Sequence, residues 1–459
     1  MKDTKRYFFC GIGGSGMLPL AMILRGHGTE VWGSDRGFDQ GRTAEKFVWL
    51  ESQGVRMFPQ DGSGLQSPEQ ILVASAAIEA SVPDVAKAEA LGCARMTRAE
   101  LNSALFNTAS GRIGVGGTSG KSTVTGMIAW ILTRSGRKPT VMNGAVMRNF
   151  SGPDAPFASA LSGDAGTYVS EVDESDGSIA LYSPTVAVVT NISLDHKSLA
   201  ELHGLFGDFT RRAGVAVVNA DDPESAPLRG SQAVTFGFAD TAHVRASDYR
   251  AEPFGCHFTA HAGGSSHGVF IRMAGRHNVA NALAAIAATQ ACGVPVAESV
   301  VALSDFAGLA RRYEVIGSAG GVTVIDDFAH NPDKVAATLA AIGDQPGRAL
   351  LFFQPHGYGP LRQMGKELAA AFAAGMRDGD QLWVCDPVYF GGTVDRSVGS
   401  EAFVADIVAG GGDAAHVASR EACGEAMLAE AKPGDRIIIL GARDDTLTEF
   451  AQSLLSALT

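Results

Sequence analysis

The residues best suited to chemistry form a loop of glycines and hydroxyl groups, GGTSGKST, at residues 116–123. Glycines let backbone N–H groups curl around phosphate oxygens, and a helix that starts after the loop adds a favourable dipole. Lys121 can reach terminal phosphates, and a hydroxyl beside it can hold Mg²⁺. Val115 stands where the strict pattern has glycine, so the match is a variant. The predicted ATP ligands are Gly117, Thr118, Ser119, Gly120, Lys121, Ser122 and Thr123.

A second glycine loop, GIGGSG, occupies residues 11–16, and Asp35 ends the next predicted strand about twenty residues on. Alone, this pattern indicates a dinucleotide site and an NAD-dependent dehydrogenase. The same glycines and helix terminus also suit the diphosphate of any nucleotide, and a purely structural turn is a third interpretation. Because ATP has its own loop, we expect a nucleotide-linked substrate here. The predicted contacts are Gly11, Gly13, Gly14, Ser15, Gly16, Asp35 and Ser75.

Polar side chains follow two further predicted strands, with SEVDESD at 170–176 and NISLDH at 191–196. Parallel strands place such residues at one carboxyl edge, where α/β proteins bind ligands. Carboxylates there can hold the Mg²⁺ that bridges nucleotide phosphates. Glu174 and Asp176 are predicted to be loop or capping residues rather than ligands. His196 is predicted to be a functional residue, the alternative being a solvent-facing histidine.

These loops require strands and helices in alternation, and the hydrophobic pattern predicts an α/β protein with mostly parallel sheets. We expect three domains: a Rossmann-like domain at 1–106, a central P-loop ATPase domain at 107–308 and a Rossmann-like C-terminal domain at 309–459. Residues 225–272 look irregular, with strand-like pieces. Predicted strands are 7–10, 30–32, 71–74, 113–115, 168–172, 186–190, 215–219, 322–325, 349–353, 381–384 and 436–440. Predicted helices are 17–24, 122–134 and 280–290.

Composition limits the possible functions. At 459 residues, the chain is long enough for about three domains. A formal charge of −12 disfavours binding to nucleic acid or to an anionic membrane surface. The N-terminus lacks a signal-peptide pattern, and no apolar run is long enough to span a membrane. The six cysteines are scattered, which excludes a zinc knuckle and fits a reducing compartment. We therefore expect a cytoplasmic enzyme.

Seven motifs, in order, carry a resemblance that spans most of the chain. They are GIGGSGM, GTSGKST, EVDESDGS, TNISLDH, GRHNVANALAA, ARRYE and DDFAHNPDK. Together they resemble the Mur ligases, the ATP-dependent amino-acid ligases of peptidoglycan assembly. The resemblance implies ATP and Mg²⁺, with UDP-N-acetylmuramate and an amino acid or short peptide as the other substrates. It implies that the sugar carboxylate is phosphorylated to an acyl phosphate, which the amine then attacks.

The resemblance also implies residue roles. Lys121, Glu171 and His196 would be catalytic, with Ser122 and Glu171 on one Mg²⁺ and His196 on a second. Asn278 and Asn281 would contact the adenine, Arg311 the phosphates and Asp327 the ribose. Three structural alternatives stay open. Asn278 could cap a helix, Asp326 and Asp327 could cap the helix after Pro332, and Arg311 or Arg312 could be a surface arginine.

The acceptor side resembles two branches of the family, one that adds L-alanine and one that recycles the murein tripeptide. The predicted contacts of the amino substrate are His330, Asn331, His356, Arg362 and Arg443. After FQPH the sequence continues GYGPLR, which lacks two cations expected in the alanine-adding branch. Arg443 stands where that branch usually has glycine, and arginine is a natural clamp for a carboxylate. L-Alanine is the first choice of amine, the tripeptide the second, and a non-catalytic nucleotide-binding regulator a third interpretation.

Overall fold

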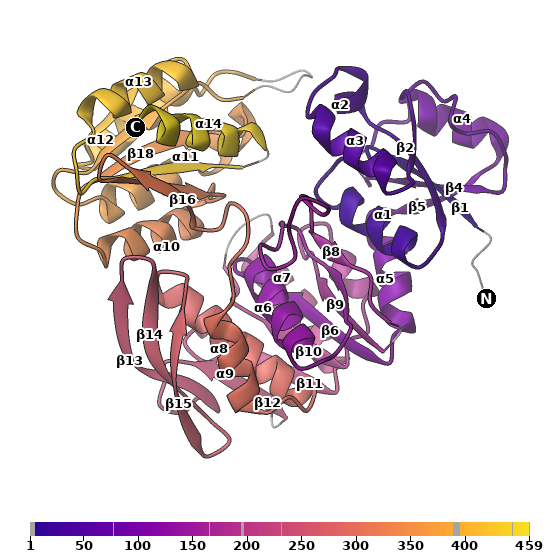
Figure 1. Cartoon of the computed structure of the whole chain (residues 1–459), viewed down its shortest axis with the longest axis horizontal. Coiled ribbons are helices and arrows are strands. Elements are labelled where there is room, and N and C mark those ends of the chain that lie inside the picture. The colour runs from indigo at the N-terminus through magenta and orange to yellow at the C-terminus, as the bar shows by residue number, and fades with distance from the viewer. Residues whose placement is uncertain are drawn as a thin grey trace. The chain divides into compact units, whose positions relative to one another are not determined.

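The computed structural model describes residues 5–76, 78–164, 166–193, 197–230, 232–388, 395–442 and 444–458. Its described part contains three sheets covered by helices, so the predicted α/β class is confirmed (Figure 1). The chain divides into two compact units, one formed by residues 1–245, 261–267 and 281–307, the other by the remainder. In the described residues no helix is long and apolar enough to cross a membrane. The three domain boundaries expected from the sequence remain predictions.

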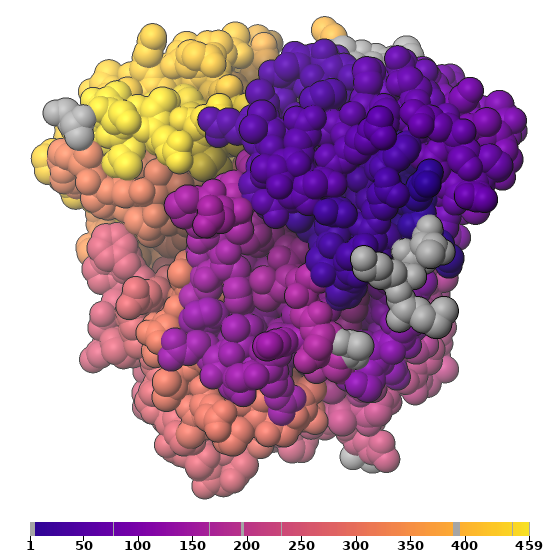
Figure 2. All heavy atoms as spheres, turned by 45° about the vertical axis from the view of Figure 1, so that its right-hand side comes forward, coloured from indigo at the N-terminus to yellow at the C-terminus, as the bar shows by residue number. Residues whose placement is uncertain are grey.

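The first sheet has the strand order β3-β2-β1-β4-β5, with parallel neighbours throughout. Its strands are β1 (Arg6–Cys10), β2 (Glu30–Ser34), β3 (Arg56–Phe58), β4 (Gln70–Ala74) and β5 (Ala94–Thr97). Its helices are α1 (Met17–Gly26), α2 (Arg36–Asp39), α3 (Ala44–Ser52), α4 (Pro83–Leu91) and α5 (Arg98–Thr108). The strand order reverses between β1 and β4, and such a switch point is where open α/β sheets bind ligands. The indigo atoms of this region form a continuous surface in Figure 2.

The second sheet is the largest, with ten strands in the order β15-β14-β13-β12-β11-β10-β6-β9-β7-β8. Its strands are β6 (Gly111–Gly116), β7 (Thr140–Met142), β8 (Ala160–Leu161), β9 (Thr167–Glu171), β10 (Val186–Val189), β11 (Val215–Asn219), β12 (Ala233–Gly237), β13 (Val244–Glu252), β14 (Gly255–Ala262) and β15 (Ser265–Ile271). The helices that follow or separate these strands are α6 (Lys121–Arg134), η1 (Ser178–Leu181), α7 (Leu199–Arg211), η2 (Pro223–Leu228), α8 (Arg276–Ala291) and α9 (Val296–Ser304).

The register of this sheet brings three predicted site segments together. β6 lies between β9 and β10, and all three run parallel (Figure 1). Val115 pairs with Glu171, while Gly116 pairs with Val189. The phosphate loop therefore starts between the acidic end of β9 and the polar residues after β10. The sequence predicted that both polar segments lie at a carboxyl edge, but not that the strand of the loop lies between them.

The third sheet has the order β16-β17-β21-β18-β19-β20, and only its β16–β17 pair is antiparallel. Its strands are β16 (Glu314–Ala319), β17 (Val322–Asp327), β18 (Ala349–Gln354), β19 (Gln381–Val384), β20 (Ala414–His416) and β21 (Arg436–Gly441). Its helices are α10 (Pro332–Gly343), α11 (Tyr358–Gly375), α12 (Ser400–Ala409), α13 (Arg420–Glu430) and α14 (Thr446–Ala457). β17, β21 and β18 are consecutive in space, so the segments that follow them share one edge.

The segment at 225–272 differs from the sequence prediction. It is not irregular, because β12 to β15 extend the central sheet there. β13 buries only Val244 and Ala246, and it reads VRASDYRAE, so polar side chains interrupt the apolar pattern that marks a buried strand. Along β14, buried residues alternate with half-buried ones from Cys256 onward. Gly263 and Gly264 separate β14 from β15.

A buried amide ties α5 to the central sheet. Asn102 is 3% exposed, and its Nδ2 donates to Ser170 Oγ at 3.0 Å and to Tyr182 Oη at 2.8 Å. Its Oδ1 accepts from Tyr168 Oη at 2.8 Å. Both tyrosine rings also pack edge-on against Phe106. Because Ser170 precedes Glu171, this cluster anchors the strand that carries the predicted metal ligand.

We predict that Asn102→Ala lowers the free energy of unfolding of the first unit by roughly 2–4 kcal/mol, because three buried hydroxyls lose a hydrogen-bond partner. Urea denaturation followed by circular dichroism measures this. Asn107→Ala is the matched control, since Asn107 lies on the same helix and bonds Leu181 O at the surface. It should cost less than about 1 kcal/mol. Equal losses in the two variants would contradict the anchoring role.

Candidate active site

The phosphate loop is fixed to the segment after β10 by side-chain and backbone hydrogen bonds. Asn191 Oδ1 accepts from Ser119 N at 2.9 Å, and Asn191 Nδ2 donates to Ser119 O at 3.1 Å. Thr190 Oγ1 also donates to Ser119 O, at 2.6 Å. Thr118 Oγ1 receives the backbone N–H of Ser193 at 3.0 Å. These bonds hold the loop in a defined curve at the start of α6, where backbone N–H groups favour anions.

The loop geometry requires glycine at two positions. Gly117 has a φ of +125°, and a Cβ there would lie 2.0 Å from Thr190 Oγ1. Gly120 has a φ of +87°, and its Cβ would lie 2.5 Å from Asn281 Oδ1. Asn281, predicted to contact adenine, therefore lies against the loop. The buried Ser119 hydroxyl has no hydrogen-bond partner among the described residues. A tight loop that contains a buried hydroxyl without a hydrogen-bond partner is suited to binding a phosphate group.

Lys121 is surrounded by carboxylates. Its Nζ donates to Glu174 Oε2 at 2.9 Å, to Oε1 at 3.1 Å and to Gly117 O at 2.7 Å. Burial alone lowers the pKa of the ammonium, but the charges of Glu174, Glu171 and Asp173 outweigh it and raise the pKa. Lys121 is therefore a buried, charged group that can bind a phosphate when the phosphate replaces Glu174 as its partner.

Two oxygen ligands suited to Mg²⁺ lie beside this lysine. Ser122 Oγ donates to Glu171 Oε2 at 2.9 Å, and Glu171 Oε2 also accepts from Gly144 N at 3.0 Å. A hydroxyl and a carboxylate are hard ligands of the kind that Mg²⁺ prefers. His196, the third predicted ligand, lies outside the described residues. Within the described ranges no group of three His, Cys, Asp or Glu side chains could hold a metal ion by itself.

The N-terminal glycine loop lies at the switch point between β1 and β4. Gly14 and Ser15 are exposed, and Gly11 has a φ of +80°. Asp35 Oδ2 accepts from Gly13 N at 2.9 Å, while its Oδ1 accepts from Gly37 N at 2.7 Å. Asp35 therefore supports the loop and caps α2. Ser75 follows β4 and is exposed.

Sequence reasoning missed a cation beside this loop. A Cβ on Gly16 would lie 2.6 Å from Arg98 Nη1, so the guanidinium rests on the last glycine of the loop. Arg98 Nη2 also lies 3.8 Å from Asp173 Oδ2. Arg98 thus connects the N-terminal glycine loop to the acidic segment that holds Lys121. The N-terminal glycine loop and the phosphate loop belong to one compact unit. No local motif marks this arginine, because its partners are far away in the sequence.

In the second unit, Asp327 and Arg311, the arginine predicted to contact the phosphates, have different surroundings. Asp327 is buried, and its oxygens accept from Tyr313 N and Ala329 N at 2.8 and 2.7 Å. Burial raises the pKa of this carboxyl to about 6. The guanidinium of Arg311 is directed inward and bonds to Asp326 and to two backbone carbonyls. Arg312 lies over the Phe328 ring, 4.5 Å from its centroid, and its charge acts on Asp327.

Two capping alternatives from the sequence are wrong. α8 starts at Arg276, so Asn278 lies inside the helix, where its Nδ2 donates to Ala274 O at 2.8 Å. Asn331, not Asp326 or Asp327, caps α10 by accepting from Lys334 N. The cap falls four residues after β17 because the short segment 328–330 intervenes.

Only some of the residues predicted to contact the amino substrate lie together. The rings of His330 and His356 lie edge to face, with centroids 5.0 Å apart. Burial lowers the pKa of His330 well below its usual range. His330 Nδ1 donates to Phe328 O at 2.8 Å, which leaves Nε2 as an acceptor. Arg362 pairs instead with Asp395, at 3.0 Å. Arg443 lies outside the described residues.

Comparison with known proteins assigns the family. Residues 6–109 match the Mur ligase family catalytic domain, 115–289 the Mur ligase middle domain and 311–443 the Mur ligase glutamate ligase domain. The UDP-N-acetylmuramate–L-alanine ligase of Geobacter sulfurreducens is 35% identical over 453 residues, covering 95% of both chains. That of Dinoroseobacter shibae is 35% identical over 97% of this chain and 96% of its own. This chain belongs to the Mur ligase family.

Solved structures agree with this Mur ligase fold. The UDP-N-acetylmuramate–alanine ligase of Thermotoga maritima superposes with a TM-score of 0.81 at 23% identity, covering 98% of each chain. The murein peptide ligase of Psychrobacter arcticus gives 0.72 at 23% identity, covering 99% of this chain and 98% of its own. At such identity the likeness extends to the fold alone.

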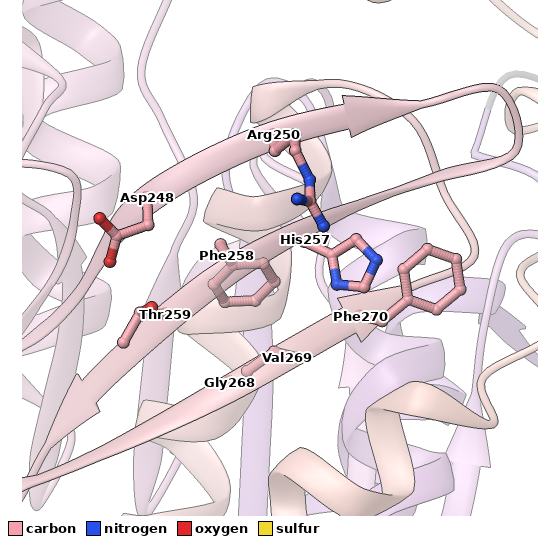
Figure 3. Close-up of a pocket in the computed structure, with 8 residues that line it drawn as sticks. All are labelled: Asp248, Arg250, His257, Phe258, Thr259, Gly268, Val269 and Phe270. Carbon is pink, nitrogen blue, oxygen red and sulfur yellow. The ribbon is translucent and has the colours of Figure 1, made fainter.

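An open hollow elsewhere in this Mur ligase contains none of the predicted site residues. It has a volume of about 460 Å³ and lies on β13, β14 and β15 (Figure 3). The rings of His257 and Phe270 face each other with centroids 4.7 Å apart. His257 and Arg250 both pair with Glu252, at 3.1 and 3.5 Å. Two of its charged side chains are thus paired with Glu252, and we assign no role in the reaction to the hollow.

We predict that Glu174→Gln in this Mur ligase lowers the Kd for Mg-ATP by about 3–10-fold, because Lys121 no longer exchanges a paired carboxylate for phosphate. Isothermal titration calorimetry measures the affinity. Asp176→Asn is the control for net charge. Asp176 is exposed in the same segment, and its carboxylate accepts a hydrogen bond from Ser178 N. An increase in Kd for the Glu174 variant alone would instead make Glu174 a nucleotide or metal ligand.

Proposed function

We propose that this chain is an ATP-dependent ligase that joins the carboxylate of UDP-N-acetylmuramate to L-alanine. The observation that carries the proposal is the 35% identity, over nearly the whole chain, to relatives named for that reaction. The geometry supports it, because one compact unit holds a loop suited to ATP and a second loop suited to a nucleotide diphosphate. We also propose that the protein acts in the cytoplasm, which was the expectation from its sequence.

The first step suits the residues around Lys121. A carboxylate is a poor acylating agent, so its oxygen attacks the γ-phosphorus of ATP, ADP leaves, and an acyl phosphate forms. Two anions must approach each other, and the Lys121 ammonium and loop N–H groups lower that repulsion. Arg98 supplies a further positive charge between the two loops.

Ser122 and Glu171 are the residues that would hold Mg²⁺, and His196 would hold a second ion. Bound Mg²⁺ supplies charge neutralisation on the phosphate oxygens. The Ser122–Glu171 contact of 2.9 Å places both oxygen ligands beside the loop, which fits this role. Asn278 and Asp327 belong to the second compact unit, and their proposed contacts with ATP rest on the family pattern. The family pattern also gives Arg311 to the phosphates, but its side chain bonds to Asp326 and to two backbone carbonyls, so we do not propose that contact.

The second step takes place at the acyl carbon. The amine attacks it, a tetrahedral intermediate forms, and phosphate leaves as the amide is made. His330 and His356 form the acceptor pair in this proposal, with Asn331 capping the helix that follows. A neutral His330 with an accepting Nε2 can orient an N–H of the incoming amine. Arg362 and Arg443 are the proposed partners of the amine substrate's carboxylate.

The murein tripeptide is the second candidate for the amine. The segment after FQPH reads GYGPLR and lacks two cations of the alanine-adding pattern, which favours a rebuilt acceptor pocket. Because tripeptide and alanine present the same kind of amino group to the acyl carbon, the chemistry is common to both.

We predict that phosphate release requires ATP, Mg²⁺, UDP-N-acetylmuramate and one amine, and that L-alanine is that amine. The measurement adds L-alanine, other amino acids or the tripeptide one at a time to an enzyme-coupled phosphate assay. Activity with tripeptide alone would replace L-alanine by the second candidate. If no amine stimulates release, the chain is not a ligase of this substrate, and a regulatory nucleotide-binding role gains support.

We also predict that Lys121→Ala lowers kcat by at least about 10³-fold, because the γ-phosphate loses its buried cation, while the affinity for the UDP-sugar stays within about twofold. Phosphate release and calorimetry with UDP-N-acetylmuramate measure the two effects. Lys138→Ala is the control, since Lys138 is exposed in the same compact unit. Unchanged ATP turnover in the Lys121 variant would refute the assignment.

A further inference from the structure

Arg311 is a buried arginine whose hydrogen-bonding capacity is used inside the protein. It is 7% exposed and has a φ of +58°, a left-handed conformation that is uncommon for residues other than glycine. Its backbone N–H donates to Glu314 Oε2 at 2.9 Å, and its carbonyl accepts from Phe328 N at 2.8 Å. The surrounding chain therefore fixes the backbone in this conformation and directs the side chain.

The guanidinium spans the chain segment after β21. Nη2 donates to Gly441 O and Nη1 to Asp444 O, both at 2.8 Å. Nε lies 3.4 Å from both carboxylate oxygens of Asp326, a residue with no exposed surface. One planar cation thus binds Gly441 at the end of β21 and Asp444 beyond it, and is itself held by a buried anion.

The side chain of Asp444 is held by residues on the side of the site that carries the acceptor histidines. Asp444 Oδ2 accepts from Gln354 Nε2 at 2.8 Å and lies 3.3 Å from Arg420 Nη1. Its Oδ1 accepts from the hydroxyl of Thr446 at 2.6 Å. Gln354 ends β18 and comes two residues before His356. Since β21 lies between β17 and β18, Gly441 and Asp444 follow a strand whose two neighbours lead to the acceptor histidines His330 and His356.

We infer that Arg311 is a positioning residue for the amine: it holds Gly441 and Asp444, and through Asp444 the side of the site that carries the acceptor histidines, and it does not bind the phosphates of ATP. This inference rests on the proposed function for the identity of the amine. Both guanidinium groups lie over the Phe328 ring, at 5.0 Å for Arg311 and 4.5 Å for Arg312. The geometry that supports the inference is that every nitrogen of the Arg311 side chain bonds within the unit.

Lysine cannot replace Arg311 in this role. An ammonium retains the charge but is a single point of donation, whereas the guanidinium has a planar fork that reaches two carbonyls and a carboxylate at once. Arg311→Lys should therefore loosen the segment without removing the positive charge. A small displacement of a substrate-positioning segment can lower reactivity on the order of 10–100-fold.

Arg436 offers a matched control because it lies at the amino end of β21, whereas Arg311 binds the carboxyl end of that strand. It is 8% exposed and donates to the carbonyls of Ile342, Gln345 and Gly347 at 3.0–3.3 Å. Arg436 and Arg311 are thus both buried arginines that bind backbone carbonyls, but Arg436 holds the amino end of β21 and Arg311 the carboxyl end. Arg436→Lys should lower stability in a similar way without affecting the amine.

The test compares steady-state kinetics of the full-length Arg311→Lys and Arg436→Lys variants. We expect Arg311→Lys to raise the KM for the amine at least about tenfold, with the KM for ATP within about twofold of the wild type. Trapping the acyl phosphate with hydroxylamine in the absence of amine should give undiminished hydroxamate. A raised KM for ATP or loss of hydroxamate would overturn the inference in favour of phosphate binding. Identical kinetic changes in both variants would overturn it in favour of a general structural role.

A second variant keeps the inference testable if Arg311→Lys does not fold. Arg420→Gln removes a partner of Asp444 that is a quarter exposed, and it should raise the KM for the amine in the same direction. Hydrogen exchange of peptides covering 441–446 should become faster in both variants and not in Arg436→Lys. Faster exchange with an unchanged amine KM would overturn the inference.

Hydrogen exchange also separates this inference from the proposed function. A wild-type protein without amine-dependent phosphate release would refute the ligase assignment, and with it the amine role of Arg311. Faster exchange at 441–446 in Arg311→Lys would still show that this side chain fixes the segment, and unchanged exchange would refute that part independently of activity.

Discussion

The charge balance around Lys121 is the interaction on which the first unit depends. A single ammonium is buried among Glu174, Glu171 and Asp173, and it stays charged because these carboxylates offset the cost of burial. A buried cation without partners would be costly, so the loop that has to meet a polyanion is stabilised by anions of its own. The tight backbone of the loop, the strand register and the hydrogen bonds of Asn191 all serve to keep that ammonium in place.

The two loops of the first unit are connected through charges rather than through shared backbone. Arg98 rests on Gly16 of the diphosphate loop and faces Asp173, which in turn acts on Lys121. A change in charge at either loop is therefore felt at the other. In the proposed reaction a carboxylate must approach a triphosphate, and such a connection would link the two proposed nucleotide sites.

How well the sequence predicted the site depends on how local each signal was. Strand, glycine loop and helix follow one another within fifteen residues, so both phosphate-type loops and their place at strand ends were predictable. The partners Lys121–Glu174 and Arg98–Asp173 are 53 and 75 residues apart, and no spacing rule reveals them. Arg311 and Arg312 are adjacent with identical chemistry, and the inward direction of the Arg311 side chain is visible only in its hydrogen bonds to Asp326, Gly441 and Asp444. The polar strand β13 was missed because its exposed face interrupts the apolar pattern.

The pairing of Val115 with Glu171 and of Gly116 with Val189 has a consequence for how this family can diverge. Successive side chains of a strand point to opposite faces, so inserting or deleting one residue within β9 would turn the Glu171 carboxylate to the other side of the sheet. Length changes are thus tolerated only beyond the strand ends. On the third sheet, the segments after β17, β18 and β21 are separate connections on one edge, and each can change in length while its strand stays in register. Divergence in the choice of amine can therefore accumulate there without disturbing the nucleotide chemistry.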